Sequence, residues 1–174
     1  MAIIIFEIIF YFAKINKDID YKQKTLYQKK NIVKNKELIF HCTSSSKKNV
    51  LRGLHAQIKN PQAKFLTVLK GKIFDVLLDL RKKSKTFGMH FSITLSNQSY
   101  SSIYIPEGFA HGFCGLDNEN IVYYGCSKYR EIDHEIGIIW NDTDLNIKWP
   151  IKKPILSKKD SHNISFKEYC DKYN

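Results

Sequence analysis

Arginine, histidine and lysine side chains lie close together in one stretch of this sequence, in an order that suits acid–base chemistry on an anionic substrate. Arg52 and His55 lie on either side of Gly53 in an apolar, strand-like run, and Lys64 follows nine residues later. If the three converge on a pocket, the guanidinium can bind phosphate, the imidazole can remove a proton near neutral pH, and the ammonium can stabilise an oxyanion. A single histidine is also a common structural or surface residue, so this pattern alone leaves both interpretations open.

A second histidine, His111, ends the segment Ile105-Pro-Glu-Gly-Phe-Ala-His111. This Pro-x-Gly-x-x-His spacing resembles the second motif of the cupins, small double-sheet jelly rolls in which a tight turn delivers a histidine into the barrel mouth. A metal-binding cupin also needs a His-x-His pair and a glutamate to complete the metal's shell. Here Gln57 follows His55 at the place of the second histidine. We therefore expect a site without metal and a chemistry that needs no cofactor.

The run Phe74–Leu80 has the two-residue period of a strand, which puts Asp75, Leu77 and Asp79 on one face. Two interpretations remain open for these carboxylates. They can lie on a solvated sheet face, or they can line a barrel interior. In the second case Asp75 needs a partner, because an unpaired buried charge is costly.

Short apolar runs separated by turn signals fill the chain after Gly53, whereas residues 1–51 contain no glycine, proline or arginine. Their spacing predicts an all-β sandwich or barrel. The main predicted strands are Ala63–Lys70, Ile73–Leu80, Met89–Leu95, Ser101–Ile105, Ile121–Tyr124 and Ile136–Trp140. Ser165-Phe-Lys-Glu168 is a capping-box pattern, which predicts one short C-terminal helix.

The length of 174 residues predicts a single domain, 1–174, with an atypical N-terminal strand region at residues 1–43. The run Ala2–Phe12 is almost continuously apolar, but it is shorter than the ~20 residues that a membrane-spanning helix needs. It contains Glu7 and has no basic residue ahead of it, unlike a signal peptide. We expect a buried or edge strand here, and no membrane partner.

The composition is that of a soluble globular protein, with 43% hydrophobic and 26% charged residues, and it excludes collagen-like, disordered and membrane-spanning classes. The chain has 28 lysines and arginines against 17 aspartates and glutamates, which gives a net charge of +11. A positive charge of this size favours an anionic partner. Only Arg52, Arg81 and Arg130 are arginines, and so few argue against a nucleic-acid reader. The four cysteines form no CxxC motif, which favours reduced thiols in a cytoplasmic protein.

Taken together, these segments resemble the dTDP-4-dehydrorhamnose 3,5-epimerase family of metal-independent cupins. Eight matching segments run in the family's order from about Ser44 to Asp160. They are Val50–His55, Gln62–Lys64, Gly71–Val76, Asp79–Arg81, Lys85–Gly88, Ile105–Phe113, Gly137–Asp142 and Pro154–Asp160. The resemblance implies a cupin double-sheet jelly roll and a homodimer joined through an edge strand, for which the apolar run Ile3–Phe12 is our candidate.

The resemblance also implies a division of roles. His55 would be the base, oriented by Asp160, with Lys64 beside the ketone oxygen of the substrate. The family's acid is a tyrosine, and its distance from the shared Gly137-Ile138 segment places it at Tyr124. The residues expected to bind substrate are Arg52, Gln57, Arg130 and the deeper pair His111 and Asp75.

The activity implied is inversion at C3, C5 or both in a nucleotide-linked 4-keto-6-deoxy sugar, by way of an enolate. The first expectation is conversion of dTDP-4-dehydro-6-deoxyglucose to dTDP-4-dehydrorhamnose. The alternatives are a single-carbon epimerase for a GDP- or CDP-linked keto sugar, a catalytically silent sugar-binding cupin, and a basic nucleic-acid-binding barrel.

Three positions depart from the family pattern. Arg130 stands where the family has a second aromatic residue, with Tyr129 displaced by one. Ala56 replaces the aromatic residue that commonly follows the base, and we expect it to widen that wall of the pocket. Residues 12–20 contain neither the arginine nor the glycine of the family's N-terminal segment, whose arginine reaches the nucleotide diphosphate.

Overall fold

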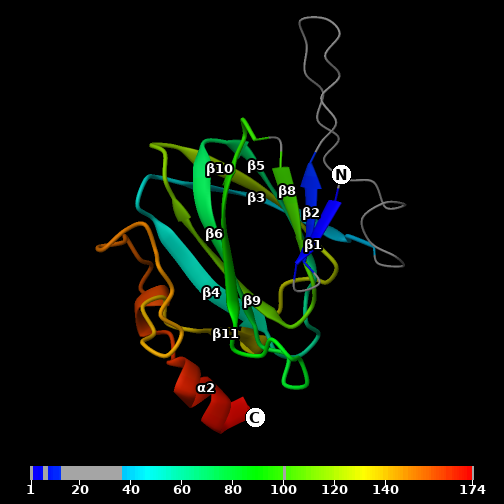
Figure 1. Cartoon of the computed structure of the whole chain (residues 1–174), viewed down its shortest axis with the longest axis vertical. Helices are drawn as coiled ribbons and strands as arrows, with labels where there is room; N and C mark the ends of the chain where they lie inside the picture. The colour runs from blue at the N-terminus through cyan, green and yellow to red at the C-terminus, as the bar shows by residue number, and fades with distance from the viewer. Residues whose placement is uncertain (1, 6–7, 13–36, 100, 174) are drawn as a thin grey trace, which may run out of the picture.

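The computed structural model describes residues 2–5, 8–12, 37–99 and 101–173, and consists of two antiparallel sheets with one short helix (Figure 1). The six-stranded sheet contains, in spatial order, β1 (Ala2–Ile5), β2 (Ile8–Phe12), β8 (Ser101–Ile105), β5 (Lys64–Lys70), β10 (Asn120–Cys126) and β3 (Phe40–Ser46). The five-stranded sheet contains β11 (Glu135–Gly137), β4 (Leu51–Gln57), β9 (Phe109–Gly115), β6 (Lys72–Asp79) and β7 (His90–Ser96). The prediction of an all-β double-sheet jelly roll is confirmed.

The main core lies between the two sheets. Inward-facing side chains of the six-stranded sheet, such as Leu66, Ile103 and Val122, pack against Leu77 and Phe113 of the five-stranded sheet. All five are almost fully buried. This is the packing expected when alternate residues of facing strands interdigitate. The packed core fixes β5, β9 and β10, the strands that carry Lys64, His111 and Tyr124.

A second core covers the outer face of the five-stranded sheet. Leu54, Val76 and Leu78 pack there against the C-terminal part of the chain, including Ile138 and Tyr169. That part contains the 3-10 turn η2 (Asp160–His162) and the helix α2 (Phe166–Tyr173), and a further 3-10 turn, η1 (Ile132–His134), precedes β11.

The C-terminal helix begins at the predicted capping box. The backbone N–H and hydroxyl of Ser165 donate to the Glu168 carboxylate, and the Glu168 N–H donates back to Ser165 Oγ. Two of the N–H groups that a helix start leaves unpaired are thereby satisfied. The predicted helix is confirmed.

The inter-sheet core covers one face of β6 and the second core covers the other, so both faces of this strand are buried. This decides whether its carboxylates lie on a solvated sheet face or in the interior. Asp75 and Asp79 are 0% and 1% exposed, and Leu77 between them belongs to the inter-sheet core. Each carboxylate has partners: His111 Nε2 lies 2.8 Å from Asp75, and Arg81 donates to Asp79. The interpretation as a solvated sheet face is wrong.

The apolar N-terminal run forms two strands where the sequence led us to expect one. β1 pairs with β2, and β2 pairs with β8, so the hairpin extends the six-stranded sheet and β1 is its edge.

The strand predicted over Ile136–Trp140 is shorter in the structure, because β11 ends at Gly137 and Ile138 then pairs with Ile164. The departure noted at residues 12–20 lies almost wholly outside the described residues.

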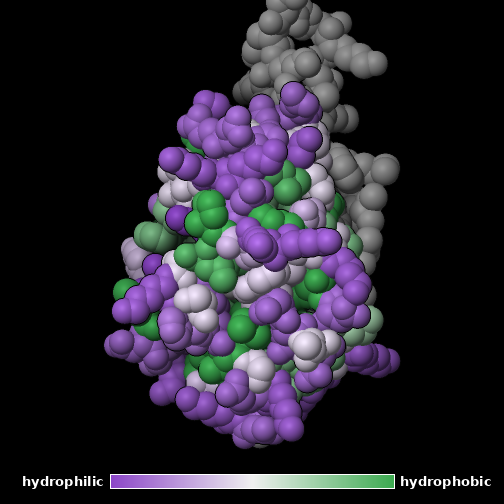
Figure 2. Space-filling view, turned by 90° about the vertical axis from the view of Figure 1, so that its left-hand side faces the viewer, coloured by the Kyte–Doolittle hydropathy of each residue, from purple (hydrophilic) through white to green (hydrophobic). Residues whose placement is uncertain are grey.

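Hydrophilic residues cover most of the face shown in Figure 2, and hydrophobic ones gather in smaller patches near its middle. Among the helices of the described residues, none has the length and apolar character needed to cross a bilayer.

Candidate active site

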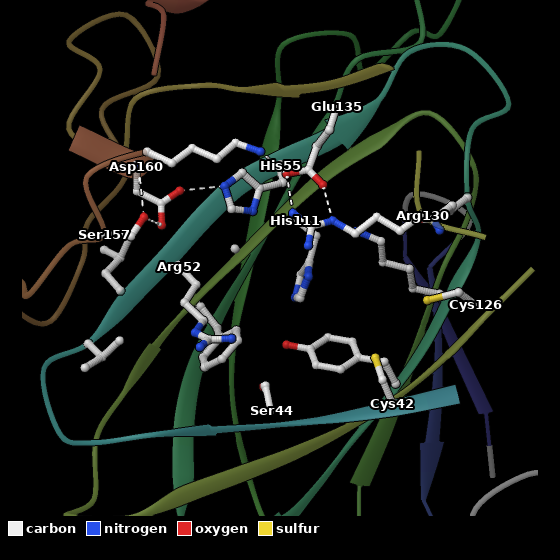
Figure 3. A pocket seen from close by; sticks show the side chains of 18 of the residues that line it. Cys42, Ser44, Arg52, His55, His111, Cys126, Arg130, Glu135, Ser157 and Asp160 are labelled. Atoms are coloured by element: carbon white, nitrogen blue, oxygen red, sulfur yellow. Dashed lines mark hydrogen bonds and ion pairs between the residues drawn. The ribbon is translucent and has the colours of Figure 1, made fainter. Parts of the chain in front are cut away.

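A cavity of about 630 Å³ opens between the sheets, lined by residues of β3, β4, β5, β9 and β10 and of the C-terminal segment (Figure 3). It is large enough for a ligand of nucleotide-sugar size, since small-molecule sites span roughly 300–1,000 Å³. Seven of the nine predicted site residues line it: Arg52, His55, Lys64, His111, Tyr124, Arg130 and Asp160. Asp75 and Gln57 do not.

A register shift on β4 brings Arg52 and His55 to the same cavity. Residues three apart in a regular strand point to opposite faces. Between them, two residues of β4 oppose one residue of β9, and Gly53 has a φ of +113°. A Cβ at Gly53 would lie 2.6 Å from the Gly112 Cα, so only glycine allows this close approach.

His55 and Asp160 form a close pair in the cavity wall. Nε2 of His55 lies 2.5 Å from Asp160 Oδ1, and Ser157 Oγ donates to the other carboxylate oxygen at 2.9 Å. Burial disfavours the charged carboxylate, but the hydrogen bonds from His55 and Ser157 outweigh this and lower the pKa of Asp160. Because an ionised carboxylate only accepts hydrogen bonds, Nε2 carries the proton and the Nδ1 lone pair is left to act as a base.

The segment that carries Asp160 is fixed on both sides of that residue. Ile155 pairs with Val50 before it, and Ile164 pairs with Ile138 after it. Asn163 donates at 3.5 Å to Asp160 and packs over Gly137, where a Cβ would lie 2.0 Å from its side-chain oxygen. The absence of a side chain at Gly137 lets this segment approach the sheet.

His111 faces His55 directly in the register of β4 and β9. Its Nε2 lies 2.8 Å from Oδ2 of Asp75, which lies behind it and outside the cavity. Within the described part of the chain, Asp75 Oδ1 has no hydrogen-bond partner. A buried acceptor left in this state is costly, so the His111–Asp75 bond is the main compensation for burying this carboxylate.

Lys64 and Tyr124 come from the opposite sheet. In the register of β5 and β10, Cys126 pairs with Lys64 and Tyr124 pairs with Leu66, so these side chains share the inward face. Burial lowers the pKa of the Lys64 ammonium, although Cys126 and nearby carboxylates partly offset the effect. Burial also raises the pKa of the Tyr124 phenol well above its ordinary value of 10, so Tyr124 keeps its proton at neutral pH.

Two residues next to the base differ from expectation. Ala56 faces the outer core with Leu54, so it cannot widen the pocket wall as we expected. Alternation along the strand turns it away from the face that carries His55. Gln57 lies beyond the cavity, where its amide donates to the Asn60 carbonyl at 2.6 Å and its carbonyl accepts the Glu131 N–H at 2.9 Å. It braces a loop and does not reach the cavity.

The cavity also holds residues that the sequence did not single out, among them Glu135, Ser157 and Lys159. Ser157 lies three residues before Asp160, a Ser-x-x-Asp spacing typical of capping, and this could have identified it. Glu135 lies two residues before Gly137 on the same strand face. This position points to the cavity less clearly than the Ser-x-x-Asp spacing does for Ser157. No cluster of three or more potential metal-ligating side chains occurs within the described ranges.

The fold and this site define a class: a cupin-type jelly roll that gathers histidine, lysine, tyrosine and carboxylate side chains in one cavity, as acid–base enzymes do. The family model for dTDP-4-dehydrorhamnose 3,5-epimerase matches residues 18–168. The chain belongs to the dTDP-4-dehydrorhamnose 3,5-epimerase family.

Individual relatives agree with this membership. Enzymes of that name from Methanothermobacter thermautotrophicus and Shigella flexneri are 45% and 43% identical over 120 and 124 residues, or 67% and 71% of this chain. The matched regions span 65% and 68% of those relatives. The crystal structure of a Legionella pneumophila 3,5-epimerase in complex with dTDP-4-keto-L-rhamnose superposes with a TM-score of 0.89 at 32% identity, covering 95% of this chain and 92% of that one.

Proposed function

We propose that this protein epimerises a dTDP-linked 4-keto-6-deoxy sugar at C3 and C5, converting dTDP-4-dehydro-6-deoxyglucose to dTDP-4-dehydrorhamnose. The observation that carries the proposal is the pairing of His55 with Asp160 on one wall of a cavity whose opposite wall carries Lys64 and Tyr124. The Legionella relative, whose crystal structure holds dTDP-4-keto-L-rhamnose, supports the substrate class.

His55 is the base of the proposed reaction. Asp160 accepts the Nε2 proton, so Nδ1 can take a proton from the carbon next to the C4 ketone. The imidazolium that forms is stabilised by the adjacent ionised carboxylate, as in other His–Asp pairs. Removal of this proton leaves an enolate with negative charge on the former ketone oxygen.

Lys64 stabilises that enolate. Its ammonium is buried, and a charged donor in a water-poor site interacts more strongly with an oxyanion than it would in water.

Tyr124 is the acid that completes inversion. The phenol keeps its proton because burial raises its pKa. It faces the cavity from β10, while the base faces it from β4 in the other sheet. A proton returned from the side opposite the base inverts the carbon, whereas a proton returned by His55 restores it.

Substrate binding falls to Arg52, Arg130 and His111. Arg52 and Arg130 are cations on the cavity wall, and they suit the diphosphate of a nucleotide sugar. His111, fixed by Asp75, lies beside the base and contacts the sugar. Gln57, which braces a loop, has no part in binding.

The positions and contacts of the three arginines argue against a nucleic-acid partner. Arg81 is paired with Asp79, Arg130 is paired with Glu135, and Arg52 lines the cavity. Binding to nucleic acid depends on cations that neutralise many phosphates along an open surface. Arg52 and Arg130 instead line a cavity that suits a small anionic substrate.

We further propose that the protein works in the cytoplasm as a homodimer. The described cysteines are free thiols, which suits a reducing compartment. The six-stranded sheet ends in β1 and β3 within the described residues, and open sheet edges favour strand pairing. Light scattering at micromolar concentration tests the dimer, and a clean monomer would contradict it.

The activity itself is tested by incubating the purified protein with dTDP-4-dehydro-6-deoxyglucose and following the sugar by proton NMR. The proposal predicts the product inverted at both C3 and C5. Inversion at one carbon only would identify a single-carbon epimerase, and an unchanged sugar that still binds would identify a silent sugar-binding cupin. Either result would overturn the proposal.

A further inference from the structure

Two cysteines lie on the cavity wall, on neighbouring strands of the six-stranded sheet. Cys42 belongs to β3 and Cys126 to β10, and both line the cavity as free thiols (Figure 3). Cys114 and Cys170 lie outside it. No step of the proposed reaction uses either cavity thiol. The cavity therefore contains a pair of soft sulfur donors that its acid–base chemistry leaves unused.

The strand register places these two thiols diagonally across from each other. Cys42 pairs with Tyr124, and Cys126, two residues further along β10 and on the same face, pairs with Phe40. Diagonal neighbours of this kind are ~7–8 Å apart, with their Cβ atoms somewhat closer. A disulfide needs Cα atoms within ~6.8 Å of each other, so this arrangement does not favour a disulfide.

A single metal ion can span the separation that is too wide for a disulfide. Two metal–sulfur bonds of ~2.3 Å in line hold their sulfur atoms ~4.6 Å apart, against ~2.05 Å in a disulfide. Among the residues that the structure describes, no group of three or more potential ligands occurs, so an ion that requires three or four ligands is not served. Cu(I) is a soft ion that thiolates select, and it accepts two sulfur ligands in line.

Lys64 supplies the positive charge that such a site requires. Cys126 pairs with Lys64 in the register of β10 and β5, on the side away from β3. Burial raises the pKa of both cavity thiols, and the Lys64 ammonium partly offsets this for each of them. A Cu(I) ion held by two thiolates forms a unit with net negative charge. The adjacent ammonium therefore stabilises the occupied site.

We propose that Cys42 and Cys126 form a Cu(I) site that blocks the cavity when it is occupied. On binding, each thiol releases its proton to solvent, two copper–sulfur bonds form, and the ion stays in the +1 state. Since Cys42 is the cross-strand neighbour of Tyr124 and Cys126 that of Lys64, the bound ion lies beside the acid and the oxyanion donor. The block of turnover rests on the proposed function, whereas the copper site does not.

The test titrates the reduced, full-length protein with Cu(I) in the absence of oxygen, in competition with a chromogenic Cu(I) chelator. Wild type is compared with Cys42→Ser, Cys126→Ser and Cys170→Ser. Cys170→Ser is the matched control, because Cys170 is partly buried, as Cys42 is, but belongs to α2 and lies outside the cavity. Thermal unfolding of each variant checks that it is folded.

Wild type and Cys170→Ser should bind one Cu(I) per chain with the same affinity. Cys42→Ser and Cys126→Ser should each bind at least about 100-fold more weakly, since loss of a ligand costs more than the roughly 10–100-fold that loss of a supporting residue costs. One equivalent of Cu(I) should stop turnover by the wild type, and excess chelator should restore it. Bound Cu(I) should also protect Cys42 of the wild type, but not Cys170, from alkylation by iodoacetamide, as followed by mass spectrometry.

Equal affinity in wild type and in both cavity variants would overturn the copper site, as would an equal loss in Cys170→Ser. If a cavity variant does not fold, the wild type decides: alkylation of Cys42 at the same rate with and without Cu(I) contradicts the site. Normal turnover with Cu(I) bound would refute the block. A wild type without epimerase activity would refute the proposed function, and the titration would still decide the copper site.

Discussion

His55 and Tyr124 line opposite walls of one cavity, the histidine on β4 of the five-stranded sheet and the tyrosine on β10 of the six-stranded sheet. Inversion of a carbon needs this arrangement, since one group must remove a proton from one face and another must supply a proton to the other.

Lys64→Ala should slow both deuterium exchange and inversion. Without the buried ammonium the enolate loses its nearest cation, and a lost oxyanion partner costs on the order of 3 kcal/mol, or roughly a hundredfold in rate. Both rates can be followed in one NMR time course in heavy water. A variant that inverts normally would exclude Lys64 as the oxyanion donor.

Gly137→Ala should weaken proton removal by His55 although it changes neither His55 nor Asp160. The new Cβ would lie 2.0 Å from the side-chain oxygen of Asn163, which packs beside Asp160. Displacement of this segment should slow exchange by about 10-fold or more. Adding Asn163→Gly to Gly137→Ala removes the clash, so the double variant should recover much of the rate; equal rates in the two variants would count against this explanation.

The buried carboxylate of Asp79 should stabilise the fold near neutral pH, and this contribution should be lost in acid. Burial opposes its charge, but hydrogen bonds from Arg81, Thr86 and Ser84 lower its pKa from 3.8 to about 2. Because the folded pKa is the lower one, the stabilisation is complete above about pH 4 and is lost as pH falls toward 2. A difference of this size corresponds to about 2 kcal/mol.

The check is urea unfolding of wild type and Asp79→Asn at several pH values. The variant should be less stable at pH 7, since it breaks the network around Arg81. Its free energy of unfolding should also fall less steeply between pH 4 and 2. Parallel pH profiles for the two proteins would show that Asp79 does not titrate as described.

Activity should survive exhaustive chelation. Each of the two histidines in the cavity is bonded through Nε2 to a carboxylate, His55 to Asp160 and His111 to Asp75, and the described residues offer no cluster of three potential metal ligands. Turnover should be equal before and after treatment with a strong chelator. Loss of turnover that added zinc or manganese restores would contradict a metal-independent reaction.

Much of the fold was accessible from sequence because its signals are local. Alternation in Phe74–Leu80 correctly assigned the faces of β6, and the capping box at Ser165 located the start of α2. Alternation could not show whether the Asp75 face meets solvent or another sheet. That depends on which segments pack together, and the C-terminal segment that covers the other face of β6 is far away in the chain.

The parts of the site that sequence reasoning missed depend on register and on distant contacts. The shift at Gly53 brings Arg52 and His55 to one cavity, and a bulge of this kind has no reliable sequence pattern beyond the glycine itself. Ala56 and Gln57 lie elsewhere than expected, for different reasons: Ala56 alternates away from the face of His55, and the Gln57 amide is bonded to the loop residues Asn60 and Glu131. Glu135 was missed because its contacts with Arg130 and Lys159 form only after folding.

The most direct test of the account is carbon-resolved deuterium exchange into dTDP-4-dehydro-6-deoxyglucose, measured for wild type, His55→Ala and Tyr124→Phe. His55→Ala should lose both exchange and inversion, because a positioned base typically contributes 10²–10⁴-fold. Tyr124→Phe should still exchange, since the base can form the enolate and return a solvent-derived proton to the original face, while inversion falls. The opposite pattern, exchange kept in His55→Ala and lost in Tyr124→Phe, would contradict the assignment of His55 as the base.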